Sequence, residues 1–254
     1  DNNTVTLSTA LGRTNTYTVE SLTIGDTRRT NTDPNNLTTI TNIGTNGTTT
    51  ITEPDGTITT KTEGPDPRWG MQSPVTTAMS IKMPSNLTYS LSGSRTATLS
   101  DSNNLLSLTG ATDTVTVNSK SYTTTYTAST KMITSTTPVG RNSYTTLDTL
   151  GRVASEQIDS LNAVNYSYDA KGRLTTITQG AEGIGQRGYT INYDALNQIS
   201  SITDPVVRSL SFAYDLAGRV TQQTLPDGRV INYSYDANGN VTSITPPSRP
   251  SHNF

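Results

Sequence analysis

The stretch from Tyr214 to Thr245 reads YDLAGRVTQQTLPDGRVINYSYDANGNVTSIT and contains one short phrase twice. Tyr-Asp is followed by two residues and a glycine, and the same pattern starts again at Tyr235. A second glycine-containing turn signal, Leu225-Pro226-Asp227-Gly228, lies halfway between the two copies. Internal repeats at such a fixed period indicate a repetitive architecture.

The phrase occurs four times, and a weaker copy at 147–152 precedes the first. In one copy asparagine replaces the glycine. The residues that we single out as a structural turn motif are Tyr168, Asp169 and Gly172, then Tyr193, Asp194 and Asn197, then Tyr214, Asp215 and Gly218, and finally Tyr235, Asp236 and Gly239.

Each copy of the phrase has the composition of a tight turn. Aspartate at the first position can accept backbone N–H bonds from residues two or three ahead. Glycine three residues later can take a positive φ without steric cost. Asn197 fits the same position because asparagine tolerates the left-handed region better than other residues. The four aspartates are therefore predicted to lie at hairpin tips, as turn formers rather than acids or metal ligands.

The segments before each turn alternate between apolar and polar residues. Val164, Tyr166 and Tyr168 share one parity, which places them on one face of a strand. After the turn, Leu174 and Ile177 are three positions apart, so a β-bulge intervenes or both faces carry apolar surface. One repeat thus corresponds to two antiparallel strands and two turns. The predicted fold is all-β, with tandem antiparallel β-hairpins that form a curved, spiralling sheet, as in a shell or barrel segment.

Residues 1–140 lack Tyr-Asp, but they are Thr-rich and turn signals recur along them. We therefore assign them to degenerate β-repeats and residues 141–254 to the repeats that contain Tyr-Asp. The segment 64–84 is rich in Pro and Met and contains Trp69. It is predicted to be an irregular insertion that packs Trp69 on apolar surface; a ligand site there is the alternative. The turn signals of the first part are Leu11-Gly12-Arg13, Asp33-Pro34-Asn35, Asn46-Gly47, Pro54-Asp55-Gly56, Ser92-Gly93-Ser94, Thr109-Gly110, Asn118-Ser119-Lys120 and Pro138-Val139-Gly140-Arg141.

The composition agrees with extended structure. Threonine makes up roughly a fifth of the chain, far above ordinary usage, and both threonine and the common tyrosine favour strands. The net charge of -2 argues against a nucleic-acid partner, which requires a basic surface. No apolar run approaches a membrane span, and without cysteine the 254 residues form neither disulfides nor thiolate metal sites. Because it starts at Asp1 without Met, the chain is expected to be a processed product or part of a larger protein.

No residue pattern predicts chemistry, so we expect no catalytic, cofactor-binding or metal-binding residues and no enzyme activity. The single histidine, His252, is too close to the chain end to be held in a Ser-His-Asp arrangement. The acidic residues lack the spacing of a calcium loop. The glycine-rich stretch Gly180–Gly185 is not followed by a helix that could bind phosphate; a four-residue hairpin insertion explains it.

The second half of the motif is carried by Gly172-Arg173-Leu174, Gly218-Arg219-Val220 and Gly239-Asn240-Val241. With Tyr-Asp, this motif resembles the YD repeats of RHS-type proteins over residues 147–245. The resemblance implies a continuous β-sheet that spirals into a hollow shell. It also implies a role, because bacterial members and related toxin-complex components wall in a C-terminal toxin, whereas the animal teneurins act in cell-surface adhesion. A secreted or cell-surface protein is expected, with the remaining shell segments and an enclosed polypeptide as its partners.

Two other functions stay open at this point. Tyrosine and threonine on an exposed sheet face could stack on and hydrogen-bond sugars, which would give a surface adhesion or glycan-binding module. In a variant, exposed sheet edges would pair between copies and form an extracellular fibre. A glycosidase with a pair of carboxylates is a third reading, but no pair of acidic residues stands out.

Overall fold

The computed structural model describes residues 2–181 and 184–254, and this part of the chain contains 22 β-strands and no helix. The all-β prediction is confirmed. The chain divides into two compact units, Asp1–Ser143 and Tyr144–Phe254. This boundary lies three positions after the division drawn from the sequence, and the assignment of the two parts to degenerate and regular repeats stays a prediction. One strand, β12 (Asn142–Leu147), spans the boundary.

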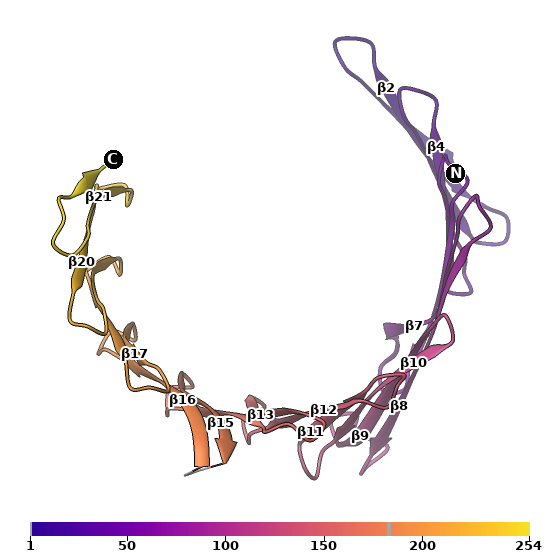
Figure 1. Cartoon of the computed structure of the whole chain (residues 1–254). Coiled ribbons are helices and arrows are strands. Elements are labelled where there is room, and N and C mark those ends of the chain that lie inside the picture. Colours follow the sequence, from indigo (N-terminus) through magenta and orange to yellow (C-terminus); the bar gives the residue numbers. More distant parts are fainter. Residues whose placement is uncertain (1, 182–183) are drawn as a thin grey trace. The chain divides into compact units, whose positions relative to one another are not determined.

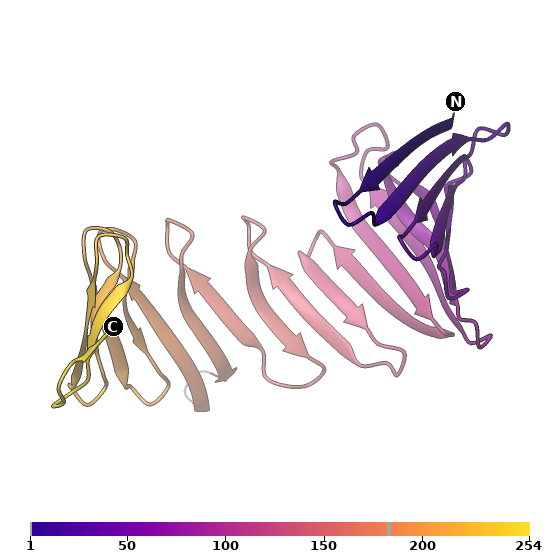
Figure 2. The same ribbon diagram turned by 90° about the horizontal axis from the view of Figure 1, so that it is seen from above.

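In the first unit each strand pairs antiparallel with the next along the chain (Figures 1 and 2). The strands are β1 (Asn2–Ser8), β2 (Thr14–Ser21), β3 (Thr27–Thr32), β4 (Thr38–Ile43), β5 (Thr48–Thr52), β6 (Ile58–Asp66), β7 (Gly70–Lys82), β8 (Thr88–Leu99), β9 (Leu108–Val117), β10 (Lys120–Thr127) and β11 (Met132–Thr136).

The second unit has the same topology, and its turns alternate between the two edges of the sheet (Figure 2). Its strands are β13 (Val153–Ile158), β14 (Val164–Tyr168), β15 (Leu174–Ala181), β16 (Ile184–Tyr193), β17 (Ile199–Thr203), β18 (Ser209–Tyr214), β19 (Val220–Thr224), β20 (Val230–Tyr235), β21 (Val241–Thr245) and β22 (His252–Asn253). The predicted tandem antiparallel hairpins are therefore confirmed.

The two faces of the first unit differ in chemistry. The registers place Thr96, Thr112, Thr125 and Thr134 in one row across β8 to β11. Side chains alternate between the faces, so the opposite face carries another row. That row contains Ala97, Ala111, Tyr126 and Ile133. Across β8 to β11 one face is thus rich in hydroxyl groups, and the other bears the aliphatic and tyrosine side chains, whereas β4 to β6 carry isoleucine on both faces.

The second unit separates its side chains in the same way because each repeat contains a β-bulge. Tyr166 faces Ile177, but Tyr168 faces Leu174, so Thr175 is left as the extra residue of the bulge. The bulge lets Leu174 and Ile177 point to the same face despite their spacing of three. The same shift of register occurs before Tyr193, Tyr214 and Tyr235. Of the two readings that the sequence left open, the bulge is the one observed.

Neither unit contains a core of fully buried apolar side chains among the described residues. Of the residues whose burial is described, only Asp66 is buried, and many large apolar side chains are exposed, such as Leu7 and Val206. A single sheet layer has nothing packed on its faces, so its apolar face is covered only by neighbouring side chains. In globular domains an apolar sheet face is buried against a second layer.

Most predicted turns lie between strands, but two do not. Ser92-Gly93-Ser94 lies inside β8 and Thr109-Gly110 lies inside β9, so both turn predictions were wrong. Gly93 has a different reason for being glycine, because a Cβ atom there would collide with the carbonyl oxygen of Thr76 on β7. Glycine inside a strand can mark such a close approach of two backbones.

The segment 64–84 consists mostly of strand in an antiparallel hairpin and not of the expected irregular structure: β6 ends at Asp66 and β7 begins at Gly70. Two shifts of register in this hairpin accommodate the segment. The buried Asp66 carboxylate accepts the N–H groups of Arg68 and Trp69 and binds the Arg95 guanidinium at 3.2 Å. Whether the segment is an insertion relative to the repeat stays a prediction.

The glycine-rich stretch Gly180–Gly185 lies at the hairpin of β15 and β16, and its residues Glu182 and Gly183 are outside the described residues. These two strands have eight and ten residues, against five in β17 and β19. Asp169 and Asp194 are 25 residues apart, whereas Asp194 and Asp215 are 21 apart, and the longer strands accompany this longer spacing.

Candidate functional site

The turns that carry the repeated phrase lie at one edge of the second unit and have one geometry. In the first of them, Gly172 N–H donates to the Asp169 carbonyl and Asp169 N–H donates to the Arg173 carbonyl, both at 2.9 Å. Gly172 has φ +83°. This is a three-residue hairpin loop in which a type I turn is followed by a left-handed residue. The backbone bonds repeat at Asp194, Asp215 and Asp236, and Asn197 takes the left-handed position with φ +69°.

The aspartate side chain stabilises each turn from within. Asp169 Oδ1 accepts the N–H groups of Lys171 at 2.9 Å and Arg173 at 3.0 Å, that is, two and four residues ahead. The sequence predicted that the N–H donors lie two or three residues after the aspartate. This was correct for Lys171 and wrong for Arg173. The left-handed residue turns its own N–H toward the aspartate carbonyl, so the next N–H is the one that meets the carboxylate.

The tyrosine of each phrase closes the edge of the sheet. Tyr168 Oη donates to the Val153 carbonyl at 2.8 Å. The hydroxyl groups of Tyr193, Tyr214 and Tyr235 donate the equivalent bond at 2.8 to 2.9 Å. In each case the acceptor is the first residue of the preceding strand. Each tyrosine hydroxyl therefore satisfies a carbonyl at the end of the ladder and fixes the ring against the neighbouring hairpin.

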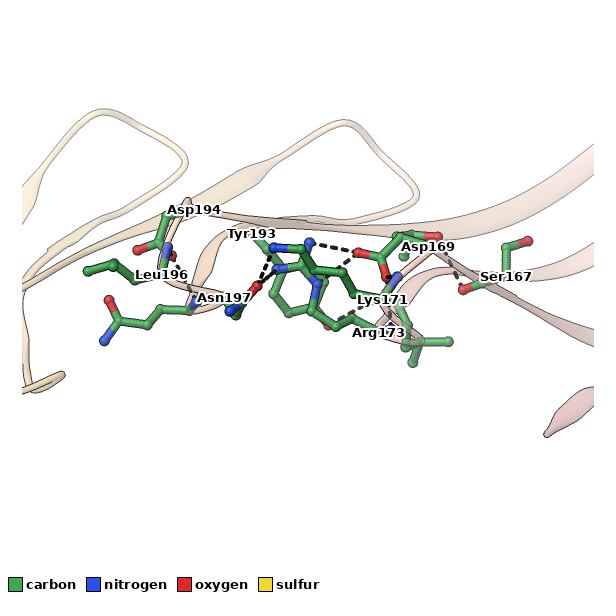
Figure 3. Close-up of polar contacts among 11 residues, drawn as sticks. Ser167, Asp169, Lys171, Arg173, Tyr193, Asp194, Leu196 and Asn197 are labelled. Atoms are coloured by element: carbon green, nitrogen blue, oxygen red, sulfur yellow. Dashed lines mark hydrogen bonds and ion pairs between the residues drawn. The ribbon is translucent and has the colours of Figure 1, made fainter. Parts of the chain in front are cut away.

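An arginine links successive turns. Arg173 forms an ion pair with Asp169 at 2.7 Å, and its guanidinium lies over the Tyr193 ring, 4.2 Å from the centroid. Its Nη1 also donates to the Asn197 side chain at 2.9 Å (Figure 3). A guanidinium over an aromatic ring is attracted by the ring's quadrupole. The Asp169 turn is thereby tied through one cation to the tyrosine and the turn of the next repeat.

The same link recurs along the edge. Arg152 pairs with Asp148 and lies 4.3 Å from the centroid of Tyr168. Arg219 pairs with Asp215 and lies 4.7 Å from the centroid of the following ring. We call this series of aspartates, arginines and tyrosines the turn ladder. Its members are Asp148, Arg152, Tyr168, Asp169, Arg173, Tyr193, Asp194, Tyr214, Asp215, Arg219, Tyr235 and Asp236.

The turn ladder shifts the acidity of its carboxyl groups. The Arg173 backbone N–H, and then the Arg173 side chain, lower the pKa of Asp169 despite an opposing effect of desolvation. Arg219 lowers the pKa of Asp215 in the same way. At Asp236 the amide side chain of Asn240 takes the place of arginine and lowers that pKa. These carboxyl groups are thus held ionised as structural acceptors.

Sequence reasoning found the aspartates, glycines and tyrosines but missed the role of the arginines. Arg173 was noted as part of a motif, yet its contact with Tyr193 requires the strand pairing to be known. Sequence reasoning also missed the turn at Asp204, which lies at the opposite edge of the sheet and has the same backbone and carboxylate hydrogen bonds as the Asp169 turn. There Val207 takes the left-handed position with φ +64°, where no glycine or asparagine signals a turn.

No group of three or more histidine, cysteine or acidic side chains that could hold a metal occurs within the described residues. His252 is exposed in the short strand β22. The aspartates of the turn ladder accept turn N–H groups, so the arrangement is suited to holding adjacent hairpins in register.

Comparison with known proteins identifies the architecture. A family model described as the teneurin YD-shell matches residues 2–254. The chain belongs to the teneurin YD-shell family. The RHS-type resemblance drawn from residues 147–245 is thereby confirmed and extends to the first unit. Membership gives the repeats of this YD-shell chain a structural role, in agreement with the geometry of the turn ladder.

Solved structures similar to this YD-shell chain include toxin-complex proteins. The crystal structure of TcdB2-TccC3-Cdc42 matches with a TM-score of 0.49 and 13% identity over 94% of this chain and 15% of that one. The structure of TcdB2-TccC3 without its hypervariable C-terminal region matches with a TM-score of 0.47 and 11% identity, over 95% of this chain and 14% of that one. The structure of the Tc holotoxin pore of Photorhabdus luminescens matches with a TM-score of 0.33 and 12% identity, over 98% of this chain and 19% of that one.

The YD-shell chain spans about 15% of the length of the first of these structures. Comparison with curated proteins found no match. Among the described residues, no helix has the length and apolar character needed to cross a membrane.

Proposed function

We propose that this YD-shell chain forms part of the wall of a β-shell that encloses a polypeptide, such as a C-terminal toxin, within a larger secreted or cell-surface protein. One observation carries the proposal: across β8 to β11 and in the second unit the apolar and tyrosine side chains lie mainly on one face, yet none of them is fully buried among the described residues. Burial of apolar surface is the main driving force of folding. The apolar face therefore requires a partner outside the chain described.

The partners follow from the chemistry of the sheet. The outer edges of β1 and β22 present backbone groups without a neighbour in the pairings of the described residues, and the remaining shell segments would pair with them. The apolar face would contact the enclosed polypeptide or the opposite wall. We propose no catalytic role for the chain itself, because its conspicuous acidic groups serve as turn acceptors.

The two faces of β18 allow a direct test in the full-length protein. The photo-crosslinker p-benzoylphenylalanine replaces either Phe212, on the apolar face, or the neighbouring Ala213, on the opposite face. Irradiation followed by mass spectrometry should yield crosslinks to the polypeptide that follows the repeats from position 212 and not from position 213. Equal crosslinking from both positions, or none from position 212, would contradict enclosure on this face.

A surface glycan-binding module is a second candidate, favoured by one feature of the first unit. Tyr122 is 46% exposed and borders an open cavity of about 650 Å³ that Lys120, Thr137 and Pro138 also line. An exposed ring beside hydroxyl groups could stack on a sugar. A glycan array probed with the wild-type chain and with Tyr122→Ala tests this candidate. The wild type should bind a glycan, and the substitution should abolish that binding.

A further inference from the structure

In the pairings of the described residues, the second part of β8 has a neighbouring strand on one side only. The pairing of β7 with β8 ends at Ala78 and Ser92. β8 continues to Leu99, and there it pairs with β9 alone. We call the side of Gly93–Leu99 that faces away from β9 the β8 edge. It lies within the sheet and is separate from the outer edges of β1 and β22.

The hydrogen bonds of β8 show which backbone groups point to this edge. Asn118 N–H donates to the Ser90 carbonyl, on the side of β9. Opposed residues of an antiparallel pair exchange hydrogen bonds at every second position. The even-numbered residues of β8 therefore bond β9, and the odd-numbered residues face the other way. The N–H and C=O groups of Arg95 and Ala97 thus point to the β8 edge, beyond the end of the pairing with β7.

β7 leaves this edge free because it passes over the face of β8. Thr77 is the extra residue where the register of β6 and β7 shifts, and the Thr76 carbonyl lies where a Cβ of Gly93 would be. Since Cβ atoms project from the face of a sheet, this part of β7 lies above β8 and not beside it. Asp66 holds the end of the hairpin there by binding Arg95, and that end stands apart from the layer of β8 and β9 (Figure 1).

The β8 edge lacks the residues that usually protect an edge. Ser94, Arg95 and Thr96 are exposed. Natural proteins block free edges with charged side chains, above all lysine, and with proline, and Gly93–Leu99 contains neither lysine nor proline. Its one charged side chain, that of Arg95, is engaged on the face of the sheet by Asp66 and by Asp113 of β9. The edge is therefore open to pairing with another strand.

We propose that the β8 edge binds an extended segment of the larger protein as an additional β-strand. The bonding groups of Arg95 and Ala97 repeat at about 6.8 Å, and an extended backbone supplies partners at the same repeat. We expect the antiparallel direction, which is slightly more stable per residue. The inference rests on the proposed function only in that its occupant is a segment outside residues 2–254.

A second copy of this chain fits the edge less well than a single segment. Only Gly93–Leu99 is free, and β7 lies on the same side of β8 before this stretch. If two copies paired antiparallel here, β7 of each would meet residues 100–107 of the other, which connect β8 to β9. A single extended segment brings no such neighbours.

Hydrogen exchange in the full-length protein tests the pairing one amide at a time. The amides of Arg95 and Ala97 should exchange at least about tenfold more slowly than in an unstructured peptide, because paired amides are protected. Mass spectrometry with electron-transfer fragmentation resolves them from the amides of Ser94 and Thr96, which bond β9 and serve as the internal reference. Exchange of Arg95 and Ala97 at the rate of an unstructured peptide would overturn the proposal.

Two proline substitutions form a matched pair. Ala97→Pro removes an N–H that points to the β8 edge, where proline costs no bond to β9. It should speed exchange at Arg95 at least about tenfold and leave the Ser94 amide protected. Thr96→Pro removes an N–H that bonds β9 and should speed exchange at Ser94. Continued protection of Arg95 in Ala97→Pro would show that no strand occupies the edge.

The photo-crosslinker p-benzoylphenylalanine at position 94 identifies the occupant. The proposal requires crosslinks to a segment of the same polypeptide outside residues 2–254. Crosslinks to residues 70–77 of β7, or between two copies of the protein, would exclude it. The crosslink from position 212 tests enclosure separately, so this inference can fail while the proposed function stands.

Discussion

At the scale of single residues, the second unit depends on a left-handed position in every turn. Glycine fills it at Gly172, Gly218 and Gly239, and asparagine fills it at Asn197. At the opposite edge Val207 takes the same conformation with φ +64° although its side chain is β-branched. A positive φ in a bulky residue is a strained conformation that the surrounding bonds must enforce. Here those bonds come from Asp204.

Relief of this strain should stabilise the chain. Val207→Gly removes the clash of Cβ with the backbone and is expected to raise the free energy of unfolding by about 1 kcal/mol. The side chain is 83% exposed, so little packing is lost. Urea denaturation followed by circular dichroism measures the change. The neighbouring Val206→Gly serves as the control and should destabilise; a gain there, or a loss at 207, would contradict the argument.

The tyrosine hydroxyls provide a second test at this scale. Tyr235→Phe removes the bond to the Val220 carbonyl and should cost about 1 kcal/mol in urea denaturation, because the carbonyl loses its partner. Tyr189 is 48% exposed and no described residue bonds its hydroxyl, so Tyr189→Phe should change stability by less than about 0.5 kcal/mol. Equal effects of the two substitutions would show that the hydroxyl bonds are irrelevant.

At the scale of the hairpin, the turns could be predicted to the extent that their chemistry is local. Asp169 and Gly172 lie within one turn, so their roles were readable from the sequence. Arg173 contacts Tyr193 only because the strands of the next hairpin pair with those of its own, and sequence spacing does not show that contact. Gly93 was misread because a glycine required by a neighbouring backbone looks the same as a turn glycine.

The two strand glycines of the first unit differ in a way that can be measured. Gly93→Ala places a methyl group against the Thr76 carbonyl of β7 and should destabilise the chain by about 1–3 kcal/mol. Gly110→Ala meets its nearest atom at 3.5 Å, an ordinary contact, and should be neutral or slightly stabilising. Thermal unfolding of both variants tests the difference, and a harmless Gly93→Ala would refute the close approach of β7 and β8.

Acid should weaken the turn ladder. The pKa of Asp169 lies below its ordinary value in the folded chain, so its contribution to stability is present above the unfolded pKa of about 3.9 and is lost as the pH falls through the folded pKa. Asp169→Asn keeps an acceptor but removes the charge. Urea denaturation at pH 7 and pH 3 should show a larger loss for the wild type than for the variant, and the opposite order would exclude the ion pair as a source of stability.

At the scale of the whole molecule, the chain is a member of the YD-shell family with a structural role, and we propose that it forms part of a shell wall. The sequence predicted an all-β repeat, and the family and the strand pairings confirm it. The sequence could not show that β8 to β11 separate hydroxyl groups and apolar side chains onto opposite faces, since this depends on registers such as Thr112 with Thr125. Under the proposed function, a sheet with one apolar face and no second layer would be completed by further polypeptide.

Electron cryomicroscopy of the full-length protein tests this claim most directly. The account predicts that residues 2–254 form a single layer of antiparallel strands, with density from further polypeptide against the face that bears Phe212 and Tyr214. A map in which that face is bare to solvent, or in which Asp169, Asp194, Asp215 and Asp236 lie in mid-strand, would contradict it.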